Sequence, residues 1–170
     1  MKAIVYAEFG ESILEFSKAG AVIGELLRPG PSSNDFDLDV AETSFTLGAG
    51  SVPAGGLLVT NGEVSPQKLF GLDDVGNVTG ELEHAAFLVG GSHHAARGSV
   101  FLVDYTTDKI REVNPATGAL LNEFSATPTG SPAFDVYYGD VAVSTDTFDA
   151  SYAQKENESA FLNMRGGVTD

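Results

Sequence analysis

The chain has 170 residues, enough for one domain with a substantial core and barely enough for two. Its 24 acidic residues against 9 basic ones give a net charge of −15, which argues against nucleic acid or an anionic membrane surface as a partner. The absence of cysteine excludes disulfides, thiol catalysis and thiolate zinc sites. Twenty glycines and eleven phenylalanines favour short strands and turns over long helices.

The N-terminal stretch "MKAIVYAEFGES" carries one lysine followed by a short alternating pattern. It lacks an apolar core of signal-peptide length and a small-residue cleavage site, so we expect no targeting segment in it. No apolar run approaches the ~18 residues of a membrane-spanning helix, which predicts no membrane insertion. Two alternatives stay open: a protein that is kept inside the cell, or a mature chain from which a signal has been removed.

A strand–turn–strand pattern occurs three times along the chain. It reads "ILEFSKAGAVIGELL" at 13–27, "LFGLDDVGNVTGELE" at 69–83 and "IREVNPATGALLNEF" at 110–124. Gly20, Gly76 and Gly118 align at the turn when Thr117 is taken as a one-residue insertion, and apolar positions and a glutamate match beyond the turn. We interpret the pattern as a repeated β-hairpin whose period is close to the ~40–50 residues of propeller blades.

Residue types at the three turns support the hairpin interpretation. Ser17, Asp73 and Asn114 can each accept hydrogen bonds from the turn backbone that follows them. The closing glycine can adopt the left-handed conformation that a bulged hairpin requires. In the first strand of each hairpin the shared apolar positions lie three residues apart, so both faces are apolar. A strand of this kind belongs inside a stack of sheets.

Further apolar strands precede the hairpins. They are expected at 3–7, 56–60 and 100–105, with a fourth strand at 36–40 and 86–90 and a further pair at 133–138 and 140–145. The resulting units are 3–30, 35–84, 85–126 and 132–150, in a single domain at 1–150 followed by a strand or arm at 151–170. The expected core includes Ile4, Tyr6, Phe16, Leu58, Leu72, Phe101, Val103 and Val113.

The third unit, "GSVFLVDYTTDKIREVNPATGALLNEF" at 98–124, resembles a blade of the NHL, YVTN and PQQ-like β-propellers of bacterial secreted and surface proteins. The first two units match more loosely, and together the units cover residues 3–145. The resemblance implies an all-β fold of four-stranded antiparallel blades in β-propeller style, and it favours an extracellular or cell-surface location. Because closed propellers use ~4–8 blades, the three to four blades here imply a small ring, a partial propeller or a stack.

The segment "DFDLDV" carries the candidate metal ligands Asp35, Asp37 and Asp39. Alternation along a strand places the three carboxylates on one face. We interpret them first as a solvated acidic face, with a Ca²⁺ site as the alternative because hard cations prefer carboxylate oxygens. The EF-hand pattern is excluded, since Val40 stands where that loop needs glycine.

Two other segments contain candidate functional residues but match no known functional motif. "GGSHHAARGS" at 90–99 contains His93 and His94, which we expect in an exposed loop between strands. "GAGSVPAGG" at 48–56 is rich in glycine, but Pro53 stands where a dinucleotide fingerprint needs its last glycine, and we interpret it as a loop.

No catalytic residue and no organic cofactor emerge from the sequence, which lacks a nucleophile elbow, a zinc-protease motif and a P-loop. The predicted function is a non-enzymatic structural or binding protein that acts through assembly. Residues 133–145 are expected to meet residues 3–16 of a neighbouring chain, which gives a homo-oligomer, a filament or a larger assembly. The alternative is a metal-dependent hydrolase, lactonase-like or esterase-like, with its site at the propeller channel.

Overall fold

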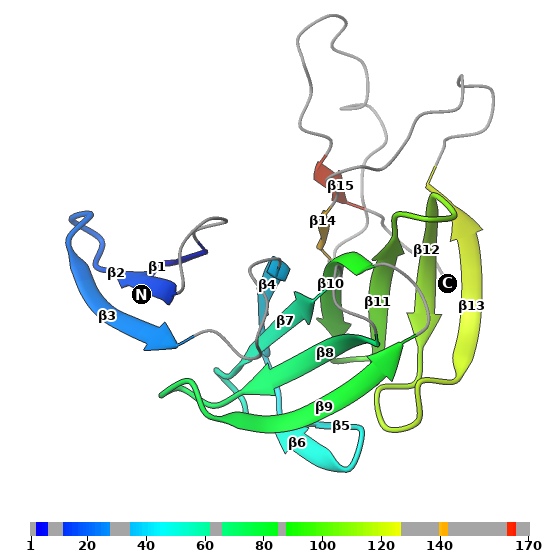
Figure 1. Ribbon diagram of the computed structural model, residues 1–170, viewed down its shortest axis with the longest axis horizontal. Helices are drawn as coiled ribbons and strands as arrows, with labels where there is room; N and C mark the ends of the chain where they lie inside the picture. The colour runs from blue at the N-terminus through cyan, green and yellow to red at the C-terminus, as the bar shows by residue number, and fades with distance from the viewer. Residues whose placement is uncertain are drawn as a thin grey trace, which may run out of the picture.

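The computed structural model describes residues 3–6, 12–27, 35–61, 66–84, 88–126, 140–142 and 163–165, all of which belong to β-strands or the turns between them (Figure 1). The strands are β1 (Ala3–Tyr6), β2 (Ser12–Phe16), β3 (Val22–Leu27), β4 (Asp35–Val40), β5 (Phe45–Leu47), β6 (Gly50–Val52), β7 (Leu57–Asn61), β8 (Gln67–Leu72), β9 (Val78–His84), β10 (Leu88–His94), β11 (Ser99–Asp104), β12 (Lys109–Val113), β13 (Leu120–Ser125), β14 (Asp140–Ala142) and β15 (Asn163–Arg165). The all-β expectation is confirmed. None of these residues lies in a helix that is long and apolar enough to cross a membrane.

Most of the strands form three antiparallel sheets that stand in a row, with the second sheet between the other two (Figure 1). The first sheet has the order β1-β2-β3, the second β4-β7-β8-β9 and the third β10-β11-β12-β13. One three-stranded unit followed by two four-stranded units is the order predicted from the sequence. Strands β14 and β15 pair in parallel instead, and the expected strand at 133–138 lies outside the described residues.

The outer hairpins of the three sheets have the same register. The equivalent cross-strand pairs are Ile13 with Leu26, Leu69 with Leu82 and Ile110 with Phe124, followed after a register shift by Phe16 with Val22, Leu72 with Val78 and Val113 with Leu120. The shift falls in each hairpin just before the last pair, next to the turn. Positions that align in the sequence therefore occupy equivalent places in the backbone ladder.

The three turns close as their residues predict. Ser17 Oγ accepts a hydrogen bond from the Ala21 N–H at 3.2 Å, and Asp73 and Asn114 accept similar bonds from the turns that follow them. The turn glycines Gly20, Gly76 and Gly118 have φ angles of 79°, 89° and 72°. This left-handed conformation costs glycine little and strains other residues, which explains the glycine at each turn.

The second unit contains an insertion that the sequence did not reveal. Residues 41–56 separate β4 from β7, whereas four residues, 95–98, separate the equivalent strands β10 and β11. Part of this insertion pairs as the short hairpin β5–β6. The interpretation of 48–56 as a loop is therefore wrong for Gly50 to Val52, which form β6.

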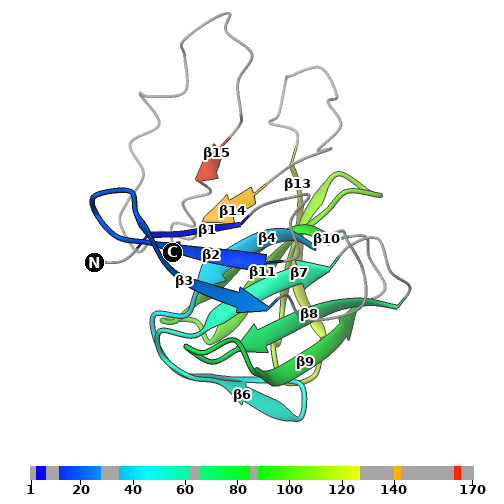
Figure 2. The same ribbon diagram turned by 60° about the vertical axis from the view of Figure 1, so that its left-hand side comes forward.

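The β5–β6 hairpin lies along β9 in both views and reaches the third sheet (Figures 1 and 2). Its Leu47 and Val52 are fully buried, and the Gly48 N–H donates a hydrogen bond to the Pro115 carbonyl at 2.9 Å. A Cβ on Gly48 or Gly50 would overlap a backbone carbonyl of β9. Glycine is thus required here because two backbones touch.

The core lies in two clusters on opposite faces of the second sheet. Leu57 and Val59 of β7 pack with Ile13 of the first sheet, whereas Leu58 packs with Leu102 of the third. Apolar residues on both faces of a strand therefore serve two neighbouring sheets, as their spacing predicts. Of the expected core residues, Leu58, Leu72, Phe101, Val103 and Val113 are buried, Phe16 is half-buried, and the side chains of Ile4 and Tyr6 lie outside the description.

Candidate functional site

The acidic strand β4 is bound to β10 of the third sheet through two of its aspartates. Asp37 Oδ2 accepts a hydrogen bond from the Gly91 N–H at 2.7 Å. Asp39 Oδ2 accepts bonds from Ser92 Oγ at 3.0 Å and from the His93 N–H at 3.1 Å. Both carboxylates are half-buried. The interpretation as a solvated acidic face is therefore wrong for Asp37 and Asp39, which join two sheets.

Alternation along β4 explains how it can face two sheets. Leu38 packs against the apolar cluster between the first and second sheets, while Asp37 and Asp39 bond to β10. The register shifts between Asp35 and Asp37, and the backbone of Asp35 pairs with Asn61. The side chain of Asp35 lies outside the description, and the described residues contain no group of three histidine or acidic side chains placed to share a metal ion. A Ca²⁺ site at this strand stays a prediction.

A small polar pocket of about 60 Å³ lies next to Asp39 and is also lined by Glu42, Ser92, His93 and His94. His93 is 8% exposed and stacks on Phe45, with the ring centroids 3.8 Å apart and the planes 14° from parallel. The expectation of an exposed loop is wrong for both histidines, because β10 continues through His94.

Burial changes the ionisation of His93. It lowers the pKa of the imidazole below its usual 6.5, the neighbouring His94 acts in the same direction, and Glu42 acts against both. Among the residues that the structure describes, none forms a hydrogen bond with either ring nitrogen of His93. A buried neutral imidazole without partners costs desolvation energy, and the stacking on Phe45 offsets part of it.

A larger groove of about 420 Å³ lies between the first and second sheets. Its lining residues include Glu15, Asp39 and Asp74 together with the aliphatic Leu26 and Leu57. The carboxylate of Asp39 nevertheless bonds to Ser92 and His93 of β10. The lining residues come from β2, β3, β4, β7 and the turn after β8, so that no single sequence motif marks the groove.

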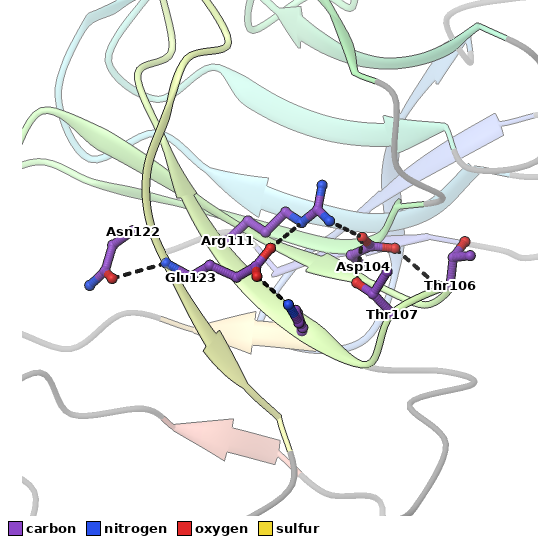
Figure 3. Close-up of polar contacts among 7 residues, drawn as sticks. Asp104, Thr106, Thr107, Arg111, Asn122 and Glu123 are labelled. Carbon is purple, nitrogen blue, oxygen red and sulfur yellow. Dashed lines mark hydrogen bonds and ion pairs between the residues drawn. The ribbon is translucent and has the colours of Figure 1, made fainter.

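The third sheet carries a network of charges around the buried Asp104, which is 1% exposed (Figure 3). Asp104 accepts hydrogen bonds from the Thr106 N–H at 2.9 Å and from Thr107 Oγ1 at 2.7 Å, and it forms an ion pair with Arg111 at 3.0 Å. Arg111 also pairs with Glu123 at 3.1 Å. Asp104, the last residue of β11, thus binds both the β11–β12 turn and Arg111 of the next strand.

Two more ionisable groups lie near or within the third sheet. The buried Glu112 accepts a hydrogen bond from Ser99 Oγ at 2.7 Å and pairs with Arg97 at 3.0 Å. His84, at the end of β9, has a pKa lowered first by burial and then by the charge of Arg111, with Asp104 opposing both. Asp104 and Glu112 thus connect strands and turns of the third sheet, and the sequence spacing had indicated neither contact.

Comparison with protein-family profiles gives no match, and comparison with curated proteins gives none either. A solved structure, described as the crystal structure of a protein of unknown function from Bacteroides caccae, superposes with a TM-score of 0.45 at 16% sequence identity. The superposition covers 68% of this chain and 39% of that one, so that this chain spans well under half of the other protein's length. A similarity this low carries no argument about fold family or function.

Proposed function

We propose that the protein is a non-enzymatic structural or binding module, built from propeller-type blades, which acts by assembling with copies of itself or with other chains. The observation that supports the blade-type repeat is the shared register of the three outer hairpins, each with its shift beside the turn and a glycine at positive φ. Repeats of this kind bury their faces against neighbouring repeats and are stable in arrays.

The first sheet supports the assembly part of the proposal. Its strand β1 pairs with β2 on one side, whereas the equivalent strands β7 and β11 are also paired on their other side, with β4 and β10. Among the described residues, no strand takes the equivalent place beside β1. An unpaired edge presents backbone donors and acceptors, and a strand from another chain would satisfy them.

The roles of the carboxylates agree with a non-enzymatic protein. Asp37 and Asp39 accept hydrogen bonds from β10, Asp104 holds a turn and Glu112 holds Ser99. Each of these groups is occupied by a protein donor that keeps two segments together. Carboxylates that act as acids, bases or nucleophiles face the space that a substrate occupies. Of these four, only Asp39 lines a pocket described above, and its Oδ2 is bonded to Ser92 and His93.

Light scattering after size-exclusion chromatography, over a wide range of protein concentration, tests the proposal. We expect masses above the 17.7 kDa of one chain that increase with concentration. A monomer at every concentration would contradict assembly with copies of itself.

Two matched proline substitutions, Ile4→Pro and Val5→Pro, locate the contact on β1. Adjacent residues of a strand direct their N–H groups to opposite sides, so one substitution removes a bond to β2 and the other removes a donor from the open edge. We expect the edge-facing variant to keep the circular dichroism of the wild type and to lose the assembly. An edge-facing variant that folds and still assembles would exclude β1 as the contact.

A further inference from the structure

The turn of an outer hairpin packs on the sheet that precedes it. A Cβ added to Gly76, in the turn of the second sheet, would lie 3.2 Å from Leu26 Cβ of the first sheet. A Cβ added to Gly118, in the turn of the third sheet, would lie 3.5 Å from Leu82 Cδ1 of the second sheet. Leu26 and Leu82 occupy equivalent register positions in β3 and β9. The two interfaces between sheets therefore repeat the same contact.

The first and third sheets each carry one further half of this contact. The turn of the first sheet has its glycine, Gly20, and no described atom lies within 4 Å of a Cβ placed there. The third sheet has Phe124 at the register position of Leu26 and Leu82, and its side chain is half-buried. The described residues include no outer hairpin after the third sheet, and hence no turn glycine to pack on Phe124.

Strand β14 marks the place where a following sheet begins. It contacts β10 and β11 of the third sheet, just as β10 contacts β4 and β7 of the second sheet. It therefore takes the place of the innermost strand of a following sheet. Among the described strands only β15 pairs with β14, which leaves one of its two edges for another strand. The first sheet, in turn, has no described strand in the innermost place beside β1.

We propose that the first sheet of one chain packs on the third sheet of a second copy, with the Gly20 turn against Phe124. Strand β14 of the second copy then lies beside β1, in a head-to-tail arrangement of chains. The occupant is a copy of this chain because the contact continues an interface that already occurs twice within it, between successive sheets. This contact rests on the proposed assembly, whose surfaces it specifies.

Apolar residues on the outer face of the first sheet support the contact. Leu14 is adjacent to Ile13 and Phe16 lies three residues after it, so both lie on the face opposite to Ile13, which packs against the second sheet. Leu14 and Phe16 are half-buried. Their equivalents in the second sheet, Phe70 and Leu72, are only 8% and 0% exposed because they pack with the first sheet. A sheet from a neighbouring chain would bury Leu14 and Phe16 in the same way, which favours association.

Light scattering of two matched leucine variants tests the contact. Gly20 and Gly55 have φ angles of 79° and 80°, and at neither would a Cβ meet a described atom within 4 Å. Gly20→Leu and Gly55→Leu therefore carry the same backbone strain, but only the first places a side chain in the proposed contact. We expect Gly20→Leu to associate about tenfold more weakly than the wild type, as overpacking of an interface provides, and Gly55→Leu to associate as the wild type does.

The possible results separate this contact from the proposed assembly. A wild type that assembles together with a Gly20→Leu variant that assembles equally well would overturn the contact and leave the assembly standing. Equal losses in the two leucine variants would also overturn the contact, because backbone strain alone would then explain them. A wild type that is monomeric at every concentration would contradict self-assembly, and this contact with it.

Engineered thiols give an independent test, because the chain contains no cysteine. Ala19→Cys and Ser125→Cys, on two separate chains, place exposed thiols next to the two halves of the contact. Thr117→Cys with Glu83→Cys in one chain occupies the equivalent positions of the internal contact and is the positive control. We expect a short bismaleimide to join the mixed chains and the control, but not either single variant to itself. A control that is cross-linked beside mixed chains that assemble without cross-linking would overturn the contact, even if Gly20→Leu does not fold.

Discussion

Substitution of Asp39 tests how the second sheet holds the third. Its Oδ2 accepts bonds from Ser92 Oγ at 3.0 Å and from the His93 N–H at 3.1 Å, and both donor residues are less than 10% exposed. A hydrogen bond to a charged acceptor contributes ~1.5–3 kcal/mol, and the half-buried position of Asp39 places each bond at the lower end. We therefore expect Asp39→Ala to lower the free energy of unfolding by about 2–4 kcal/mol.

Asp39→Asn and Ser92→Ala divide this effect between charge and geometry. The amide of asparagine keeps an acceptor oxygen without the charge, so we expect a loss of about 1–2 kcal/mol. Ser92→Ala removes one donor and leaves the bond from the His93 N–H in place, with an expected loss of about 1 kcal/mol. Urea unfolding followed by circular dichroism and tyrosine fluorescence measures all three variants. Glu42→Gln, at an exposed carboxylate beside the same pocket, serves as the control.

Two results would contradict this reasoning. An Asp39→Ala protein within about 0.5 kcal/mol of the wild type would mean that the bonds to β10 contribute little. An Asp39→Asn protein more stable than the wild type would mean that repulsion among Asp35, Asp37 and Asp39 outweighs those bonds. Greater stability of Asp39→Asn is the result expected if Asp35, Asp37 and Asp39 form a cation site that holds no ion.

Three further predictions follow from the turns, the buried histidine and the acidic strand. Gly118→Ala should lower the free energy of unfolding by about 1 kcal/mol, because the φ of 72° strains alanine while its Cβ meets only ordinary contacts; urea unfolding that matches the wild type would contradict this. The folded-state pKa of His93 lies below 6.5, so its contribution to stability is fully present above pH 6.5 and is lost as the pH falls through the folded-state pKa. Thermal unfolding between pH 7 and pH 5 should show a fall in Tm that is smaller in His93→Gln, and equal slopes would exclude His93 as the source. If Asp35, Asp37 and Asp39 form a Ca²⁺ site, Tm should rise more with millimolar Ca²⁺ than with NaCl of equal ionic strength, and equal shifts would indicate general screening of the charge.

The outer hairpins could be predicted from the sequence because their determinants are local. Asp73 and Gly76 lie three residues apart in one turn, where the carboxylate accepts the turn N–H groups and the glycine supplies the positive φ. The apolar spacing of β7 and β8 likewise predicted strands buried on both faces, since side chains alternate along any strand. These features depend on residues that are neighbours along the chain.

The contacts of the candidate site depended on the tertiary structure. Asp37 accepts a hydrogen bond from Gly91, 54 residues away, and sequence alone identifies the acceptor without its donor. The burial of His93 also could not be predicted from the sequence, because it depends on Phe45 of the inserted β5–β6 hairpin, which stacks on the imidazole ring. The alternation of side chains along a strand predicts which of them share a face, but it does not predict which sheet packs on that face. The partner of each face was decided by the packing of sheets from distant parts of the chain.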